Sequence, residues 1–257
     1  MSIYNHFRKD EMPFVERALE MLSLVERKQT MRLTDFMDPR QLFIMKSLSS
    51  QVDDVCVQSN GGCEGAERTR ALLFPSYMEP SLEDYQIVLA EIKGDQRFIK
   101  LEHRDILGSI LGIGLKREKF GDILLGEDGC QLILAREVFD FARLQITQIH
   151  RIPVILEEVD WTSIRLPEPK LTEKQVTIPS ERLDAVIGEV YHLSRSKALV
   201  PIRAGKCKVN WKVIEDPSHQ VQVGDVLSVG GFGRCKIMEI QGPTRSGRLR
   251  MTLGIFG

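Results

Sequence analysis

One segment near the end of this 257-residue chain restricts the fold more than any other, because it specifies where a helix starts, where it stops and that a strand comes next. Ser194 can cap the start of a helix by accepting a backbone hydrogen bond, and Gly205 can end it in the left-handed conformation. A short strand of period two comes after the glycine, and in it Cys207 and Val209 face inward. Pro201 falls inside the predicted helix, where it is expected to kink or shorten the last turn.

The same segment is strongly cationic. It holds six basic residues and no acidic one: Arg195, Lys197, Arg203, Lys206, Lys208 and Lys212. Lys206, Lys208 and Asn210 are expected to share the outward face of the strand, beside a helix that carries the other cations. Unneutralised positive charge attracts phosphate. A solvated basic surface is the more common explanation of such a run, so charge by itself does not establish RNA binding.

Two short motifs flank this segment, Arg182-Leu183-Asp184 before it and Gly224-Asp225 after it, and the whole arrangement matches one known type of domain. Residues 181 to about 240 therefore resemble the RNA-binding domain first described in small-subunit ribosomal protein S-four, a helix-loop-helix followed by a small twisted sheet. The resemblance implies docking on structured RNA. Together with the basic run, it predicts these RNA-binding residues: Arg182, Ser194, Arg195, Lys197, Arg203, Lys206, Lys208, Asn210 and Lys212.

The net charge of the chain hides an asymmetry. The total is −1, but residues 181–257 hold 12 Lys and Arg against 7 Asp and Glu, which leaves 23 against 29 for residues 1–180. A basic surface concentrated near the C-terminus is compatible with RNA binding despite the moderate total. No apolar run approaches the roughly 18 residues of a spanning helix, and the first residues lack the apolar core of a secretory signal. We therefore expect a cytoplasmic protein without a membrane segment.

Proline-rich segments divide the chain. Residues 75–81 separate an N-terminal part from the middle, and residues 166–179 are predicted to be an extended connection because each proline disfavours helix. We therefore expect an α+β protein of three small domains: an N-terminal α+β domain over residues 1–78, an RRM-like middle domain over 79–166, a linker over 167–180 and an S-four-type domain over 181–257.

Hydrophobic periodicity predicts the elements of the first two domains. In the N-terminal domain we expect a helix over about 9–27, a helix with Pro39 at its first position, and strands near 53–58 and 68–74. The middle domain is predicted to follow the βαββαβ order of ferredoxin-like and RRM-like folds, with strands near 86–93, 123–125, 131–135 and 153–159 and helices near 104–113 and 137–147. An RRM stacks bases on aromatic residues of its central strands. The strand 131–135 has none, so the fold alone does not predict that binding mode.

A second resemblance extends beyond the C-terminal module. It rests on polar segments of the middle domain, residues 103–108 and 115–123, and on residues 1–4 and 34–40. Together they make the whole chain resemble the YlmH family of bacterial RNA-binding factors. The resemblance implies a role on the large ribosomal subunit, handling stalled peptidyl-tRNA in ribosome-associated quality control, beside an older association with cell division. The partners it implies are large-subunit rRNA, tRNA, the large subunit and a quality-control protein. We expect a monomer, with further phosphate contacts from Arg104, Lys116, Arg117 and Lys119.

The main alternative is an RNA-modifying enzyme, a pseudouridine synthase or a methyltransferase, because the same C-terminal module is appended to such enzymes. Arg182-Leu183-Asp184 matches the catalytic triplet of the synthases, but a helix is predicted to continue from Ala185 where the synthases have a turn. For a methyltransferase, residues 108–114 would have to cradle a cofactor, whereas these glycines fall at the end of a predicted helix. His103 is predicted to act at that helix start rather than as a base.

The five cysteines are scattered and lie without histidine at zinc-ligand spacing, so we interpret them as free thiols. No phosphate-binding loop of the nucleotide triphosphatases is present in the sequence. The sequence therefore predicts a non-enzymatic RNA-binding adaptor with no catalytic residue, no cofactor and no metal.

Overall fold

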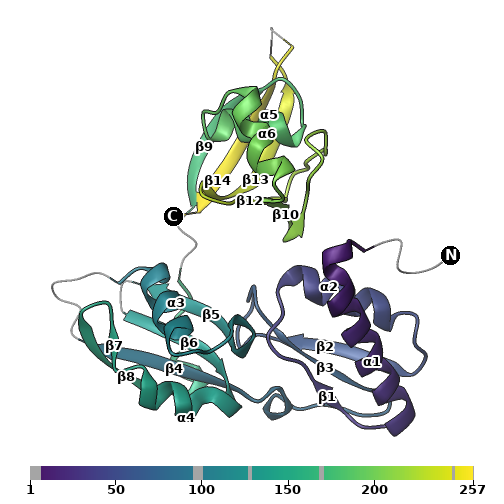
Figure 1. The fold of residues 1–257 in the computed structure, drawn as a ribbon, viewed down its shortest axis with the longest axis vertical. Helices are drawn as coiled ribbons and strands as arrows, with labels where there is room; N and C mark the ends of the chain where they lie inside the picture. Colours follow the sequence, from purple (N-terminus) through teal and green to yellow (C-terminus); the bar gives the residue numbers. More distant parts are fainter. Residues whose placement is uncertain (1–6, 95–100, 127–128, 168–170, 245–246, 257) are drawn as a thin grey trace. The chain divides into compact units, whose positions relative to one another are not determined.

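The computed structural model describes residues 7–94, 101–126, 129–167, 171–244 and 247–256. It divides the chain into two compact units, Met1–Pro167 and Glu168–Gly257. Figure 1 shows mixed helix and sheet in both units, which confirms the α+β class. The expected first and second domains lie together in the first unit, and their separation stays a prediction.

The N-terminal part of the first unit packs two helices on a small antiparallel sheet. The sheet has the order β1-β3-β2, with β1 (Arg32–Leu33), β3 (Arg70–Pro75) and β2 (Val55–Asn60). Helix α1 (Met12–Lys28), preceded by the single turn η2 (Lys9–Glu11), buries residues three or four apart: Val15, Ala18, Leu22 and Val25.

Helix α2 (Pro39–Ser49) begins where the sequence predicts, because the Asp38 carboxylate accepts a hydrogen bond from the Gln41 amide at 2.9 Å and Pro39 occupies the first helical position. The two predicted helices and two predicted strands of this part are confirmed within about three residues, the largest difference being the start of α1; β1 is an addition that the sequence does not predict.

The middle part of the first unit has the predicted βαββαβ order. Its antiparallel sheet runs β5-β6-β4-β8-β7, with β4 (Ile87–Gly94), β5 (Phe120–Gly126), β6 (Gly129–Ala135), β7 (Gln148–Ile149) and β8 (Ile152–Glu158). Helices α3 (His103–Gly112) and α4 (Arg136–Gln145) cover one face, where Ile106, Ile110 and Phe139 pack with Leu132 and Leu156 of the sheet. The short strand β7 adds an edge that the sequence does not predict.

The opposite face of this sheet, which an RRM would offer to bases, is covered by the chain itself. Leu89 and Ile133 on this face are buried in one cluster with Phe36, Trp161 and Ile164. Trp161 belongs to the turn η5 (Trp161–Ser163). The Gln131 amide is fully buried here, where it donates to Ser163 O at 3.0 Å and accepts from Arg165 N at 2.8 Å. The central strands of this sheet therefore have no open stacking surface.

Charged side chains join the two parts of the first unit. The Arg68 guanidinium donates to three carbonyl oxygens, those of Phe36 (2.8 Å), Phe120 (3.3 Å) and Arg117 (3.3 Å). The Asp122 carboxylate accepts from the amides of Glu67 and Arg68, at 2.7 and 3.2 Å. The turns η3 (Glu83–Tyr85) and η4 (Arg117–Lys119) complete the unit.

The second unit is a six-stranded antiparallel sheet with two helices on one face. Its order is β11-β10-β12-β13-β14-β9. The strands are β9 (Leu171–Ile178), β10 (Cys207–Val209), β11 (Lys212–Val213), β12 (Val226–Val229), β13 (Gly233–Pro243) and β14 (Leu249–Phe256), and the helices are α5 (Leu183–Val190) and α6 (Arg195–Arg203). Both helices contribute buried side chains to one core with the sheet, among them Ile187, Ile202 and Leu227.

The expected linker over 167–180 is largely a strand, which corrects the prediction. Strand β9 pairs with β14 along its whole length, from Ile178 opposite Leu249 to Leu171 opposite Phe256. Prolines favour an extended backbone, and the sequence does not distinguish an extended linker from a strand whose partner lies far along the chain. The second unit therefore starts before residue 181.

Candidate nucleic-acid interface

The basic segment is organised by helix α6, whose two ends are fixed as the sequence predicts. Ser194 Oγ accepts from Lys197 N at 3.4 Å at the start. At the end, Gly205 N donates to Ile202 O (3.0 Å) and Lys206 N to Pro201 O (2.9 Å), and Gly205 has a φ of +66°. This pair of hydrogen bonds around a left-handed glycine is a Schellman motif. It fixes the direction in which Lys206 and β10 leave the helix.

Pro201 does not shorten the helix. The helix continues two residues beyond it to Arg203, and the ring of Pro201 is buried in the unit. The Pro201 carbonyl accepts the hydrogen bond from Lys206 N, so this residue takes part in the motif that ends the helix. Proline lacks only the amide hydrogen, and its carbonyl remains an acceptor.

Helix α6 and the residues just after its end expose four cations: Arg195, Lys197, Arg203 and Lys206. Arg195 lies 3.9 Å from the Asp184 carboxylate, at the outer limit of an ion pair. A second carboxylate lies close to the end of the helix, since a methyl group at Gly205 would lie 3.3 Å from Glu215 Oε1. The surface of α6 is thus predominantly positive.

The strand contributes cations on the other side of the sheet. Cys207 and Val209 pack in the core with α6, so the exposed Lys208 between them points away from the helices. Lys208 lies opposite Ser228, which lies opposite Arg234, and opposed residues of antiparallel strands share a face. Arg234 is absent from the predicted set; the period of two along β13 could have placed it on this face. The helix and the strand therefore present cations on two sides of the layer.

Asn210 lies beyond the strand rather than on its outward face. It has a φ of +48°, and its side-chain amide donates to Asp225 Oδ1 at 2.7 Å and accepts from Val226 N at 2.9 Å. The amide therefore holds the turn at Gly224-Asp225, and its expected RNA contact stays a prediction. Lys212 is half-buried in the short strand β11.

Arg182 and Asp184 form a two-bond ion pair at the start of α5. Arg182 Nε donates to Asp184 Oδ1 at 3.0 Å, and Nη2 donates to Oδ2 at 2.9 Å. Asp184 is 3% exposed. Hydrogen bonding from Arg182 holds the pKa of the Asp184 carboxyl below its ordinary value, against the effect of burial. This geometry gives Asp184 a structural role in the second unit, and it leaves part of the Arg182 guanidinium at the surface.

The four residues predicted to make further phosphate contacts differ in their exposure and in the internal partners of their charged groups. Lys116 is exposed, and Arg104 is exposed with a 2.9 Å ion pair to Glu102. Arg117 donates to the carbonyls of Phe120 and Gly121 at 2.8 and 3.0 Å, and burial lowers its pKa to about 10. Lys119 forms ion pairs with Asp35 (2.6 Å) and Glu137 (3.3 Å). Internal partners therefore occupy Arg117 and Lys119.

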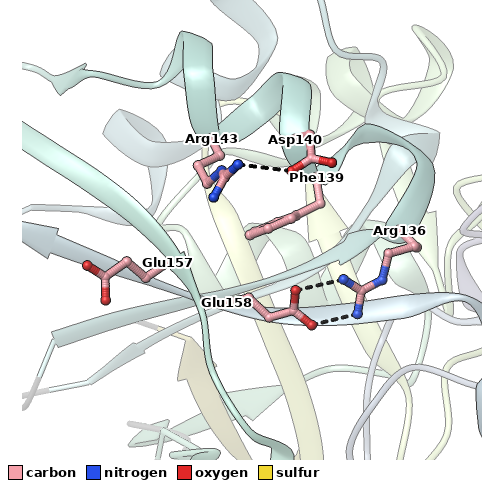
Figure 2. Close-up of a pocket in the computed structure, with 6 residues that line it drawn as sticks. All are labelled: Arg136, Phe139, Asp140, Arg143, Glu157 and Glu158. Atoms are coloured by element: carbon pink, nitrogen blue, oxygen red, sulfur yellow. Dashed lines mark hydrogen bonds and ion pairs between the residues drawn. The ribbon is translucent and has the colours of Figure 1, made fainter.

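A surface hollow of about 390 Å³ lies between α4 and β8 in the first unit. Figure 2 shows its six lining residues: Arg136, Phe139, Asp140, Arg143, Glu157 and Glu158. Arg136 donates two hydrogen bonds to the Glu158 carboxylate, at 2.7 and 2.6 Å, and Arg143 lies 3.3 Å from Asp140. Glu157 is paired with Lys93 outside the hollow, so each of the five charges has an opposite partner. The six lining residues include no nucleophile with a neighbouring base.

The cysteines have no partner arrangement typical of a site. All five are free, and burial raises the pKa of Cys130 to about 12 and of Cys207 and Cys235 to about 11, so these thiols stay protonated at neutral pH. The described residues contain no group of three or more potential metal ligands. Within the same residues, no helix has both the length and the apolar character needed to span a bilayer.

Comparison with family models matches three stretches of the chain. Residues 10–78 match the model of the N-terminal part of YlmH, residues 80–163 match a putative RNA-binding domain in YlmH, and residues 174–227 match the S4 domain. The last match begins inside β9 and covers α5, α6 and the first strands after them.

Two known proteins are similar over long stretches. "Ribosome-associated protein quality control protein P2" of Bacillus subtilis (strain 168) is 42% identical over 250 residues, which are 97% of this chain and 97% of that protein. The solved structure of "Cell division protein ylmH from Streptococcus pneumoniae" is 33% identical, with a TM-score of 0.55 over 64% of this chain and 100% of that one.

Proposed function

The chain belongs to the YlmH family, and from that premise we propose that it is an RNA-binding factor of the ribosome. It binds large-subunit ribosomal RNA and peptidyl-tRNA, and it acts with a protein partner in the quality control of stalled nascent chains. The name of the Bacillus subtilis relative and the RNA-binding models that match two stretches support this proposal.

The observation that carries the proposal is the exposed positive surface of α6. The capped helix and the residue after its end expose four cations: Arg195, Lys197, Arg203 and Lys206. Phosphates can reach them with little competition, because the ion pair of Arg195 with Asp184 is long, at 3.9 Å. Neutralising phosphates releases counterions, which supplies binding energy that is independent of base sequence. Lys208, Lys212 and the open side of Arg182 add cations, while Ser194 and Asn210 add polar groups at the ends of the same segment.

The two units divide the work in this proposal. The second unit binds the ribosomal RNA. The first unit contacts tRNA through Arg104 and Lys116, which are exposed, and not through the covered face of its sheet. Arg117 and Lys119 support this surface from within, because their charged groups are held by Phe120, Gly121, Asp35 and Glu137.

The first test measures binding to purified large ribosomal subunits over a series of salt concentrations. The logarithm of the association constant should fall linearly with the logarithm of salt, and replacing Arg195 and Lys206 together by alanine should reduce the slope by about 2, since each phosphate contact contributes about 0.9. Lys46→Ala is the matched control, because Lys46 is an exposed lysine on α2 of the first unit. An unchanged slope for the double variant would remove these residues from the interface.

A second measurement separates an adaptor from an RNA-modifying enzyme. We propose that the chain works as a cytoplasmic monomer without a catalytic step, a cofactor or a metal. Ribosomal RNA incubated with the protein should therefore show no new pseudouridine or methyl group by mass spectrometry. A modification that appears with the wild type and disappears with Asp184→Ala would establish the enzyme instead.

A further inference from the structure

An exposed aromatic ring lies on the hairpin loop between β12 and β13, at residues 230–232. Phe232 is 45% exposed. The turn that carries it is tight: Gly231 and Gly233 have φ of +85° and +105°, and Phe232 N donates to Val229 O at 2.9 Å. Glycines at positive φ let the chain reverse tightly on either side of Phe232, and the backbone hydrogen bond to Val229 closes the turn. The ring is therefore presented to solvent by a constrained turn.

The ring is supported from behind. Tyr191, the residue that caps the end of α5, lies with its ring centroid 5.4 Å from that of Phe232, and the planes meet at 46°. Tyr191 Oη donates to Gly233 O at 3.3 Å, which ties the hairpin to the end of the helix. Aromatic pairs at this distance attract each other, so one side of Phe232 is occupied and the rest of the ring stays open.

The loop also touches the basic segment. Gly230 N donates to Lys206 O at 2.9 Å, and a methyl group at Gly230 would lie 3.3 Å from Lys206 Cβ. Tyr191 precedes α6 by a few residues and Lys206 comes just after it, so the loop that carries Phe232 is attached to chain segments on both sides of the helix that carries the cations. An open aromatic ring next to exposed positive charge is the combination with which proteins hold unpaired nucleotides.

We propose that Phe232 is a stacking surface for an unpaired base of the RNA whose phosphates contact α6 and Lys206. This inference rests on the proposed function and specifies its ligand: RNA with an unstacked nucleotide in a loop or bulge, in preference to a continuous duplex. In a duplex the bases stack on one another and their faces are not available to a side chain. The cations supply affinity for any RNA, and the ring supplies the preference for RNA with an unpaired base over a continuous duplex.

The test compares two RNA probes that carry the same number of phosphates. One is a hairpin with an unpaired loop that contains 2-aminopurine, and the other is a blunt duplex; because stacking tolerates every base, the loop sequence is not critical. Phe232→Leu keeps apolar bulk and removes the ring, and it should weaken hairpin binding about tenfold while duplex binding is unchanged. Phe232→Trp keeps an aromatic ring and should bind the hairpin as tightly as the wild type does.

The salt dependence separates the ring from the charges. Stacking releases no counterion, so Phe232→Leu should lower the association constant at every salt concentration without changing the slope, whereas Lys206→Ala should reduce the slope by about 1 on both probes. Val223→Ala is the matched control, because Val223 is 57% exposed on the turn that precedes β12, at the far end of that strand from the loop. It should bind both probes as the wild type does.

The outcomes distinguish this inference from the proposed function. Equal hairpin affinity for Phe232→Leu and the wild type would overturn the stacking role and leave RNA binding in place. Absence of salt-dependent binding to large subunits by the wild type would remove the proposed function itself. The wild-type protein gives one further readout that needs no variant: 2-aminopurine fluorescence should fall when the loop base stacks, and unchanged fluorescence of bound hairpin would also overturn the inference.

Discussion

At the scale of single residues, the ion pair of Asp184 with Arg182 determines how the second unit responds to acid. The folded-state pKa of Asp184 lies below its ordinary value, so the carboxylate contributes stability above the unfolded-state pKa of about 3.9, and this contribution disappears as the pH falls through the folded-state pKa. Asp184→Asn should lower the free energy of unfolding by about 2 kcal/mol at pH 7, because a buried charged hydrogen-bond acceptor is lost.

Urea unfolding at a series of pH values measures this effect on one unit. The chain has two tryptophans, and in a Trp161→Phe background the fluorescence of Trp211 reports on the second unit. The difference between Asp184→Asn and the background should shrink below about pH 4, where the carboxyl of the unfolded chain takes up its proton while the folded-state carboxylate is still ionised. A difference that stays constant down to about pH 2, well below the ordinary pKa of a carboxyl, would contradict a charged role for Asp184.

Residue types at the candidate interface are predictable from the sequence, but their pairing is not. The cations of α6 follow from the basic run, and they are exposed as expected. Lys119 also belongs to a basic segment of the sequence, yet its ammonium group donates to Asp35, which lies 84 residues away in the sequence. Asn210 is likewise occupied by Asp225. The fold brings such partners together, and the local spacing of residues along the sequence does not predict them.

At the scale of elements, the end of α6 depends on the left-handed conformation of Gly205. Any residue with a Cβ is strained at a φ of +66°, so Gly205→Ala should lower the free energy of unfolding of the second unit by about 1 kcal/mol. Gly108→Ala is the matched control, because Gly108 lies inside α3 and a Cβ added there would meet no atom within 4 Å.

The control should move in the opposite direction, toward higher stability by about 0.5 to 1 kcal/mol, since alanine loses less backbone entropy in a helix. The fluorescence of Trp211 reports Gly205→Ala in the Trp161→Phe background, and that of Trp161 reports Gly108→Ala in a Trp211→Phe background. A destabilisation by Gly108→Ala comparable to that by Gly205→Ala would show that backbone conformation is not the cause.

Local signals account for the elements that the sequence predicts well. Helix α2 is specified by Asp38 and Pro39, and α6 by Ser194 and Gly205, all within a few residues of the ends they determine. The two-residue strands β1 and β7 escape prediction because two residues show no period. Strand β9 resembles a linker in the sequence because its partner residues in β14 lie far downstream, from Leu249 opposite Ile178 to Phe256 opposite Leu171.

At the scale of the whole molecule, the sequence predicts three domains and the structure groups them as two compact units. Proline-rich residues 75–81 do separate two patterns of elements, and two family models meet there. The sequence does not reveal how firmly the two parts adhere. Phe36 packs on the sheet of the middle part. Arg68 donates to carbonyls on both sides, through hydrogen bonds between residues 32 and 52 positions apart.

Arg68 is therefore the residue whose loss should separate these two parts. Its guanidinium has acceptors in both, the carbonyl of Phe36 in one and those of Phe120 and Arg117 in the other, and alanine would leave these oxygens unpaired in a partly buried region. Arg68→Ala should lower the free energy of unfolding of the first unit by about 3 kcal/mol. It should also broaden or split a transition that is single in the wild type, because the two parts would lose their shared contacts.

Trp161 is placed to report this change, since it packs with Phe36 over the covered sheet face. In a Trp211→Phe background, its fluorescence in Arg68→Ala should change at a lower urea concentration than the circular dichroism of the helices does, because the shared face opens before the separate cores unfold. Arg17→Ala, at an exposed arginine of α1, should leave the two signals coincident. Coincident transitions in Arg68→Ala as well would mean that apolar packing alone holds the parts together, and that the charged contacts at this boundary contribute little to its cooperativity.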